Sequence, residues 1–199
     1  HHHRFSLVLA MNFHTSTRRG FTLIELMVTI AIAATLMLIA APSFTEFQRN
    51  SQLSSLTNTL MAAVNAARGE AMKRNMYAYV MPVDGANWSS GWPVFVDKDL
   101  SQSFTSDDEV VLVVAPPPGY ITVSGTGTSA AGTPFIMFNG SGYPGLGNTF
   151  GNQTFTIARN DVTSNQQATK TRRLIIANSG RVRTCRPDKD SSCTASANQ

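Results

Sequence analysis

An acidic residue, Glu25, lies inside an otherwise apolar run from Phe21 to Ala41. A carboxylate at lipid depth costs roughly 2.5–3.5 kcal/mol, so it needs a partner of opposite charge, and the run contains no basic residue. Cleavage between Gly20 and Phe21 would create an α-ammonium group, and the ammonium of a neighbouring subunit would then supply the missing cation. The alternative is a carboxyl group that is protonated or that reaches toward the lipid headgroups.

A second group of chemistry-bearing residues lies near the C-terminus. Leu174 to Ile176 form an apolar stretch, Asn178 to Gly180 form a turn, and Arg181 to Arg183 begin a return strand. Alternate strand positions share a face, so Arg181 and Arg183 should project together while Val182 points into the core. The cations predicted to extend this surface are Lys170, Arg172, Arg173 and Arg186.

Guanidinium groups on a rigid turn suit phosphate, because each fork donates paired charge-assisted hydrogen bonds to neighbouring oxygens. Double-stranded DNA is therefore a candidate partner. No aromatic residue interleaves the cluster, so such binding would be electrostatic and independent of base sequence. The alternative is that these cations keep a strand edge soluble or pair with the acidic surface of an adjacent subunit.

The two cysteines of the chain, Cys185 and Cys193, are close enough in sequence for a disulfide to close a small loop. Such a bridge persists in an oxidising compartment. The alternative is two free thiols.

Nothing after residue 20 combines histidine with a nucleophile or suggests an acid–base pair, so we expect no enzymatic activity and no cofactor. The acidic run Asp107, Asp108, Glu109 lacks the ligand spacing and glycine of a calcium loop, and we interpret it as a solvated turn with no metal.

The apolar run itself is long enough to cross a membrane, because 21 residues at 1.5 Å rise span a layer of about 30 Å. Arg18 and Arg19 precede it, so the positive-inside rule predicts a cytoplasmic N-terminus at the inner membrane and a periplasmic or extracellular remainder. A secretory signal peptide is the competitor, but its apolar region is shorter and uncharged. We expect residues before Met11 to be a tag remnant or a misassigned start.

After the apolar run, residues 42–75 have the pattern of an amphipathic helix that ends near Lys73 to Asn75. We expect this half to pack against a sheet; a coiled-coil partner is the alternative. Pro42 removes one backbone donor, so the helix should bend or locally melt there.

Beyond the helix, residues 76–199 have short β-prone runs between turn-rich segments, which predicts an α+β fold with an antiparallel sheet domain. The segments Gly125–Pro134 and Asn139–Asn152 are interpreted as exposed loops. The expected strands are Met76–Val83, Trp92–Val96, Val110–Ala115, Tyr120–Ser124, Phe135–Phe138, Thr154–Ala158, Arg172–Ala177 and Arg181–Cys185.

The segment from Arg18 to Leu26, RRGFTLIEL, resembles the processing site of type IV prepilins and type II secretion pseudopilins. The resemblance implies that residues 1–20 are a leader, that prepilin peptidase cleaves after Gly20 and methylates the amine of Phe21, and that 21–41 is the transmembrane assembly helix. It also implies that Glu25 pairs with the N-terminus of another pilin subunit during filament assembly.

The sequence Gly180-Arg181-Val182-Arg183 resembles the GRxR motif of FimT-type minor pilins, which bind DNA in natural transformation. With the N-terminal motif and the β-rich region, the whole chain is similar to the GspH/FimT family. The resemblance implies DNA contacts from Arg181 and Arg183, with Gly180 shaping the turn. FimU-like priming pilins and H-type pseudopilins share the fold, so a purely structural subunit is the alternative function.

Overall fold

The computed structural model describes residues 20–130, 132–145 and 152–196. Its first element is α1, a continuous helix from Leu23 to Arg74. The chain divides into two units within this helix, His1–Thr45 and Glu46–Gln199, and each is described by itself.

The first unit contains the apolar part of α1. Its large side chains are exposed on every side of the helix, with Leu23 79% and Leu38 77% accessible. This helix is long and apolar enough to cross a membrane, as the sequence predicts. Of the two alternatives expected at Pro42, a bend or local melting, the melting is wrong, because α1 stays helical through this residue. The Thr45 hydroxyl donates to the Ala41 carbonyl at 3.1 Å, close to the backbone donor that proline lacks.

The second unit contains two antiparallel four-stranded sheets. The first has the order β3-β2-β1-β5, and the second β4-β6-β7-β8. The expectation of an α+β fold with antiparallel sheets is confirmed. The strands are β1 (Ala78–Val80), β2 (Trp92–Val96), β3 (Glu109–Val114), β4 (Ile121–Gly125), β5 (Ile136–Phe138), β6 (Gln153–Arg159), β7 (Thr171–Ile176) and β8 (Val182–Cys185).

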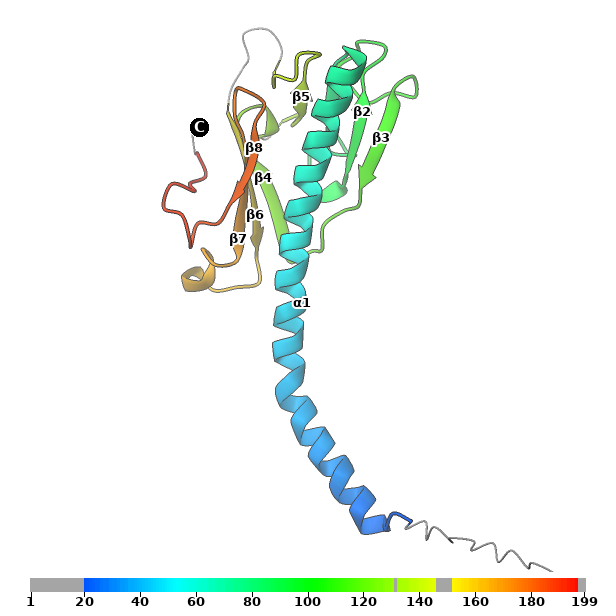
Figure 1. Cartoon of the computed structure of the whole chain (residues 1–199), viewed down its shortest axis with the longest axis vertical. Helices are drawn as coiled ribbons and strands as arrows, with labels where there is room; N and C mark the ends of the chain where they lie inside the picture. Colours follow the sequence, from blue (N-terminus) through cyan, green and yellow to red (C-terminus); the bar gives the residue numbers. More distant parts are fainter. Residues whose placement is uncertain (1–19, 131, 146–151, 197–199) are drawn as a thin grey trace, which may run out of the picture. The chain divides into compact units, whose positions relative to one another are not determined.

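Both sheets bury their inner faces against the second half of α1 (Figure 1). In that view β4, β6, β7 and β8 lie to one side of the helix and β2 and β3 to the other. The helix contributes one apolar stripe, in which large residues such as Leu53 and Leu60 are followed by the small residues Ala63, Ala67 and Ala71, all fully buried. This packing onto sheets is the arrangement expected from the amphipathic pattern, and not a coiled coil.

Two segments differ from their expected structure. The first predicted strand, Met76–Val83, is a regular strand only over β1, where its registers with β2 and β5 cover residues 78–80. Backbone hydrogen bonds extend its contact with the β2 segment on both sides, from the Asp97 N–H to the Tyr77 carbonyl and from the Val83 N–H to the Gly91 carbonyl, each at 2.9 Å. The segment Gly125–Pro134 is not simply an exposed loop: Gly127–Ser129 form a 3-10 helix, η2, and the buried Trp88 indole donates to the Ser129 carbonyl at 3.0 Å. Residues 146–151 of the other predicted loop lie outside the described residues.

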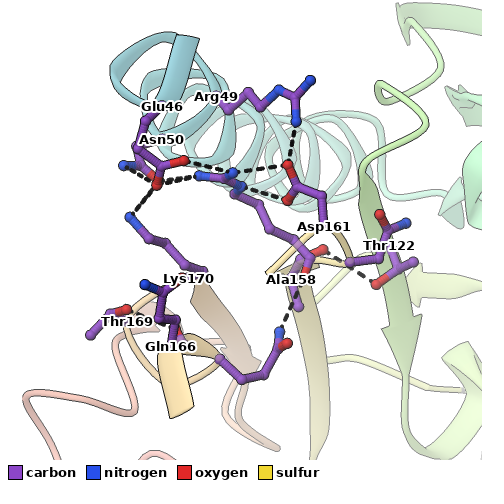
Figure 2. Close-up of polar contacts among 12 residues, drawn as sticks. Glu46, Arg49, Asn50, Thr122, Ala158, Asp161, Gln166, Thr169 and Lys170 are labelled. Atoms are coloured by element: carbon purple, nitrogen blue, oxygen red, sulfur yellow. Dashed lines mark hydrogen bonds and ion pairs between the residues drawn. The ribbon is translucent and has the colours of Figure 1, made fainter. Parts of the chain in front are cut away.

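A buried guanidinium fastens α1 to the second sheet (Figure 2). Arg159, at the end of β6, is only 2% exposed and donates to Glu46 of the helix at 2.8 and 2.9 Å. It also donates to Asp161 at 2.9 Å and to the amide oxygen of Asn50 at 2.8 Å. Side-chain hydrogen bonds from Arg159 lower the pKa of Glu46 and of Asp161 to about 2.

The substitution Arg159→Met should lower the free energy of unfolding by about 3 kcal/mol, because it leaves two paired carboxylates without their buried cation. Unfolding can be followed by tryptophan fluorescence, since Trp88 and Trp92 both lie in the core. The matched control is Lys73→Met, whose side chain is 72% exposed beside Glu70 and should change stability by less than about 0.5 kcal/mol. Equal effects of the two variants would contradict the role given to Arg159.

Candidate assembly segment and nucleic-acid interface

The N-terminal assembly residues stand at the start of α1. Phe21 is 77% exposed, and Thr22 precedes the first helical residue. The Glu25 backbone N–H donates to the Thr22 hydroxyl at 3.2 Å, an N-terminal cap in the T-x-x-E arrangement of a capping box. Glu25 also lies in the first turn, where the helix dipole favours negative charge. Arg18, Arg19 and the rest of the predicted leader before Gly20 lie outside the described residues.

Sequence reasoning missed this cap of the first helical turn by the Thr22 hydroxyl. The signal was available, since a threonine three residues before a glutamate at a helix start is the pattern of a capping box. The cap orders the first turn of the helix, which carries Glu25 four residues after the residue that cleavage would expose.

The C-terminal hairpin is built on a tight turn between β7 and β8. The Gly180 N–H donates to the Ala177 carbonyl at 2.8 Å, and the Ala177 N–H donates to the Arg181 carbonyl at 2.9 Å. Gly180 has a φ of 83°, the left-handed conformation that closes a three-residue hairpin loop. A Cβ atom there would lie 2.2 Å from the Gly142 carbonyl oxygen and 2.8 Å from Nε of Arg68.

This turn is seated on the helix through Arg68, whose Nε donates to the Gly142 carbonyl at 2.9 Å. Only a residue without a side chain fits between this pair and the turn. The position of Gly180 in the GRxR sequence therefore has a physical reason independent of any ligand.

The two arginines that follow differ in exposure. Arg181 is exposed at the tip of the hairpin, whereas the Arg183 side chain is 27% exposed, with Nη1 3.9 Å from Asp190. Val182 packs against the main core, as predicted. The first residue of β8 is Val182, so Arg181 belongs to the turn and not to the strand as predicted.

The other cations that the sequence grouped with them are divided among different contacts. Lys170 lies in the Arg159 network, with Nζ 2.8 Å from Glu46 and 3.0 Å from Asn50 (Figure 2). Arg173 donates from Nη1 to the Cys193 carbonyl at 2.8 Å and from Nε to Thr156 at 3.3 Å. Both therefore hold the fold together.

Arg172 and Arg186 instead line a cleft together with Arg183. Arg172 Nη1 donates to the carbonyls of Thr169 and Thr171, each at 3.0 Å, and burial together with the nearby charge of Arg186 lowers its pKa. Arg186 pairs with Asp188 at 2.8 Å. This cleft, called the basic cleft below, has a volume of about 490 Å³ and is lined by Ser54, Thr57, Asn58, Arg172, Arg183, Thr184, Cys185, Arg186, Lys189 and Asp190.

The predicted disulfide between Cys185 and Cys193 is confirmed, with their Cα atoms 5.9 Å apart. It closes the loop that carries Arg186 and Lys189, so one wall of the basic cleft is covalently fastened to β8. The opposite wall comes from α1. Sequence reasoning missed the helix residues Ser54, Thr57 and Asn58, because more than a hundred positions separate them from the hairpin.

The acidic run agrees with its prediction in part: Asp107 is exposed in a turn, whereas Glu109 belongs to a strand. Glu109 is the first residue of β3 and pairs with Lys98 at 2.9 Å and with Arg74. Three other carboxylates, of Asp97, Asp99 and Asp108, have oxygens within 4.8 Å of one another. Asp97 and Asp108 accept backbone N–H bonds, from Gln102 and Lys98 respectively at 3.0 Å, and so order the loop between β2 and β3.

Replacing Gly180 with alanine should destabilise the protein by about 1–3 kcal/mol, because the new Cβ meets both a positive φ and the Gly142 carbonyl. Thermal unfolding measures the effect. Gly119→Ala is the matched control, since nothing lies within 4 Å of a Cβ there and it should be neutral or slightly stabilising. A Gly180→Ala variant as stable as this control would show that the hairpin does not rest on Arg68 and Gly142.

Comparison with known proteins agrees with this architecture. The structure resembles the type IV minor pilin FimU of Pseudomonas aeruginosa in two crystal forms. In the P21 form the TM-score is 0.55 at 20% identity, covering 74% of this chain and 99% of FimU. In the P65 form the TM-score is 0.51 at 20% identity, covering 71% and 99%. At this identity the likeness concerns the fold.

A curated relative is the type IV major pilin protein PilA of Myxococcus xanthus, 40% identical over 60 residues. The match covers 30% of this chain and 27% of PilA, so it spans less than a third of that relative.

Two family models match. Residues 15–41 match the prokaryotic N-terminal methylation motif, and residues 56–180 match the family described as type II transport protein GspH. The second match covers more than half of the chain, including both sheets up to Gly180 of the hairpin turn. The chain therefore belongs to the GspH family of type IV pilin-like proteins.

Proposed function

We propose that this chain is a minor pilin that binds double-stranded DNA through its basic C-terminal hairpin and takes part in DNA uptake during natural transformation. The observation that carries the proposal is the exposed Arg181 at the tip of a hairpin held rigid by Gly180, Arg68 and the Cys185–Cys193 bridge. Among the described residues, Arg181 forms no ion pair. A guanidinium group presented in this way can meet a phosphate without giving up an existing partner.

The assembly part of the proposal uses the N-terminal half of α1. Prepilin peptidase would cleave after Gly20 and methylate Phe21, and the capped first turn would then present Glu25 to the ammonium group of another pilin subunit. The methylation-motif match and the pilin names of FimU and PilA support this step. Before assembly the helix would sit in the inner membrane with its N-terminus in the cytoplasm, and afterwards the globular unit would be periplasmic or extracellular as part of the pilus.

The cationic side chains of the hairpin favour recognition of the DNA sugar–phosphate backbone. Its contacts would be guanidinium and ammonium groups with phosphate oxygens, which carry no information about base sequence. Affinity should therefore fall steeply with salt, because each neutralised phosphate releases condensed counterions.

A structural subunit without DNA binding is the second candidate, either a priming minor pilin or an H-type pseudopilin of type II secretion. The specific observation in its favour is the description of the matching family as a type II transport protein. In that case, the hairpin cations would contact acidic surfaces of neighbouring subunits.

The two candidates are separated by the double substitution Arg181→Ala and Arg183→Ala in the mature protein, held in non-ionic detergent. DNA binding should weaken at least about tenfold, and the log–log salt slope should fall by about 0.9 for each phosphate that the variant no longer neutralises. Fluorescence anisotropy with a short labelled duplex measures both. The matched control removes two positive charges elsewhere, by Lys73→Ala and Lys98→Ala, and should bind nearly as wild type. A wild-type protein without measurable DNA affinity would leave the structural subunit as the better proposal.

Processing can be tested by mass spectrometry of the protein from its native host. The expected product begins at Phe21 and carries one methyl group on its amine. The substitution Glu25→Gln should leave this product unchanged, since it lies beyond the cleaved bond, but should sharply reduce incorporation into filaments because the acid that pairs with the neighbouring ammonium is gone. Filaments that incorporate the glutamine variant as well as wild type would argue against charge pairing at this position.

A further inference from the structure

We infer that the basic cleft holds a phosphodiester of the bound DNA, as a second contact besides the hairpin tip. The inference rests on the proposed function and adds residues from a different element, the helix α1. The contact would place the sugar–phosphate backbone between Asn58 of the helix and the disulfide-closed loop.

The charges lining the cleft favour an anion. Four cations line it, Arg172, Arg183, Arg186 and Lys189, against the single carboxylate of Asp190. Arg186 is paired with Asp188 at 2.8 Å and Arg183 lies 3.9 Å from Asp190, but the hydrogen bonds of Arg172 go to backbone carbonyls, which do not neutralise its charge. A phosphate between these groups would relieve their mutual repulsion and gain charge-assisted hydrogen bonds.

The uncharged residues that line the cleft favour binding of the DNA sugar–phosphate backbone over binding of a base. Ser54, Asn58 and Thr184 offer hydroxyl and amide groups, and none of the described residues that line the cleft is aromatic. Stacking of a base therefore has no platform. The volume of about 490 Å³ lies within the range of roughly 300–1,000 Å³ typical of small-ligand pockets, so a phosphate can enter together with part of its sugars.

The far wall of the cleft is formed before any ligand arrives. The Cys185–Cys193 bridge closes its loop, Arg173 donates to the Cys193 carbonyl at 2.8 Å, and the Asp190 N–H donates to the Arg186 carbonyl at 3.0 Å. Binding therefore costs little further conformational entropy.

One duplex can reach both contacts. Arg181 directly precedes β8 and Cys185 ends it, so the two residues are about 13 Å apart at ~3.3 Å per strand residue. This separation is well within one helical turn of DNA, about 34 Å. The hairpin tip and the cleft can therefore engage the same stretch of backbone.

The test places a charge on the helix wall without touching the hairpin. In the mature protein in detergent, Asn58→Asp should weaken binding of the labelled duplex about tenfold and lower the salt slope by about 0.9, because the new carboxylate repels the phosphate in the cleft. Asn58→Lys should tighten binding a few-fold. The matched control is Thr59→Asp, which introduces the same charge at an exposed neighbouring position that does not line the cleft.

The outcomes separate the two proposals. Normal affinity of Asn58→Asp, or equal weakening in Thr59→Asp, overturns the cleft contact, while wild-type binding that is sensitive to Arg181→Ala keeps the proposed function intact. Absence of wild-type binding overturns both. Circular dichroism of each variant checks that the fold is retained, and tighter binding by Asn58→Lys gives a result that unfolding cannot imitate.

Discussion

Burial of one stripe of α1 against two sheets is the interaction on which the globular unit depends. The stripe changes from leucine to alanine between Leu53 and Ala71, and the small side chains let strand residues such as Val80 and Phe138 pack close to the helix within the same core. Neither sheet could bury its apolar face without the helix, because both contribute to one cluster around it. This packing positions two of the polar features of the unit. The Arg159 network fixes Glu46 and Asn50 on the second sheet, and Arg68 seats the hairpin turn.

The helix also meets two different demands along its length. Its first half is apolar all round, as lipid or a bundle of similar helices requires, and its second half carries only the apolar stripe.

The carboxylates Glu46 and Asp161, which pair with Arg159, have a pKa of about 2, below the values of their unfolded forms. Their contribution to stability is therefore present above about pH 5 and disappears as the pH falls toward 2. The network that holds the helix on the sheet should remain intact at mildly acidic pH.

The sequence predicted those features that depend on local pattern. The end of the helix, the positions of the strands, the disulfide and the inward direction of Val182 all follow from periodicity, turn residues or spacing. The grouping of the cations could not be predicted in the same way. Lys170 is close in sequence to Arg172, but Lys170 forms an ion pair with Glu46. Only the fold brings these two residues together. The basic cleft was missed for the same reason, since much of its neutral wall comes from α1.

The division of the cations also bears on the choice between the two functions. If these residues served only solubility, they would be expected on open surface with water around them. Arg172 and Arg173 are instead half-buried, and burial lowers the pKa of both, so the protein keeps these charges at a cost in desolvation. Arg173 has a structural reason in its bond to the Cys193 carbonyl. Arg172 bonds only to carbonyls beside its own strand while facing a cleft with three other cations. A partner with closely spaced negative charges would offset that cost, and the phosphates of the proposed DNA ligand would supply such charges.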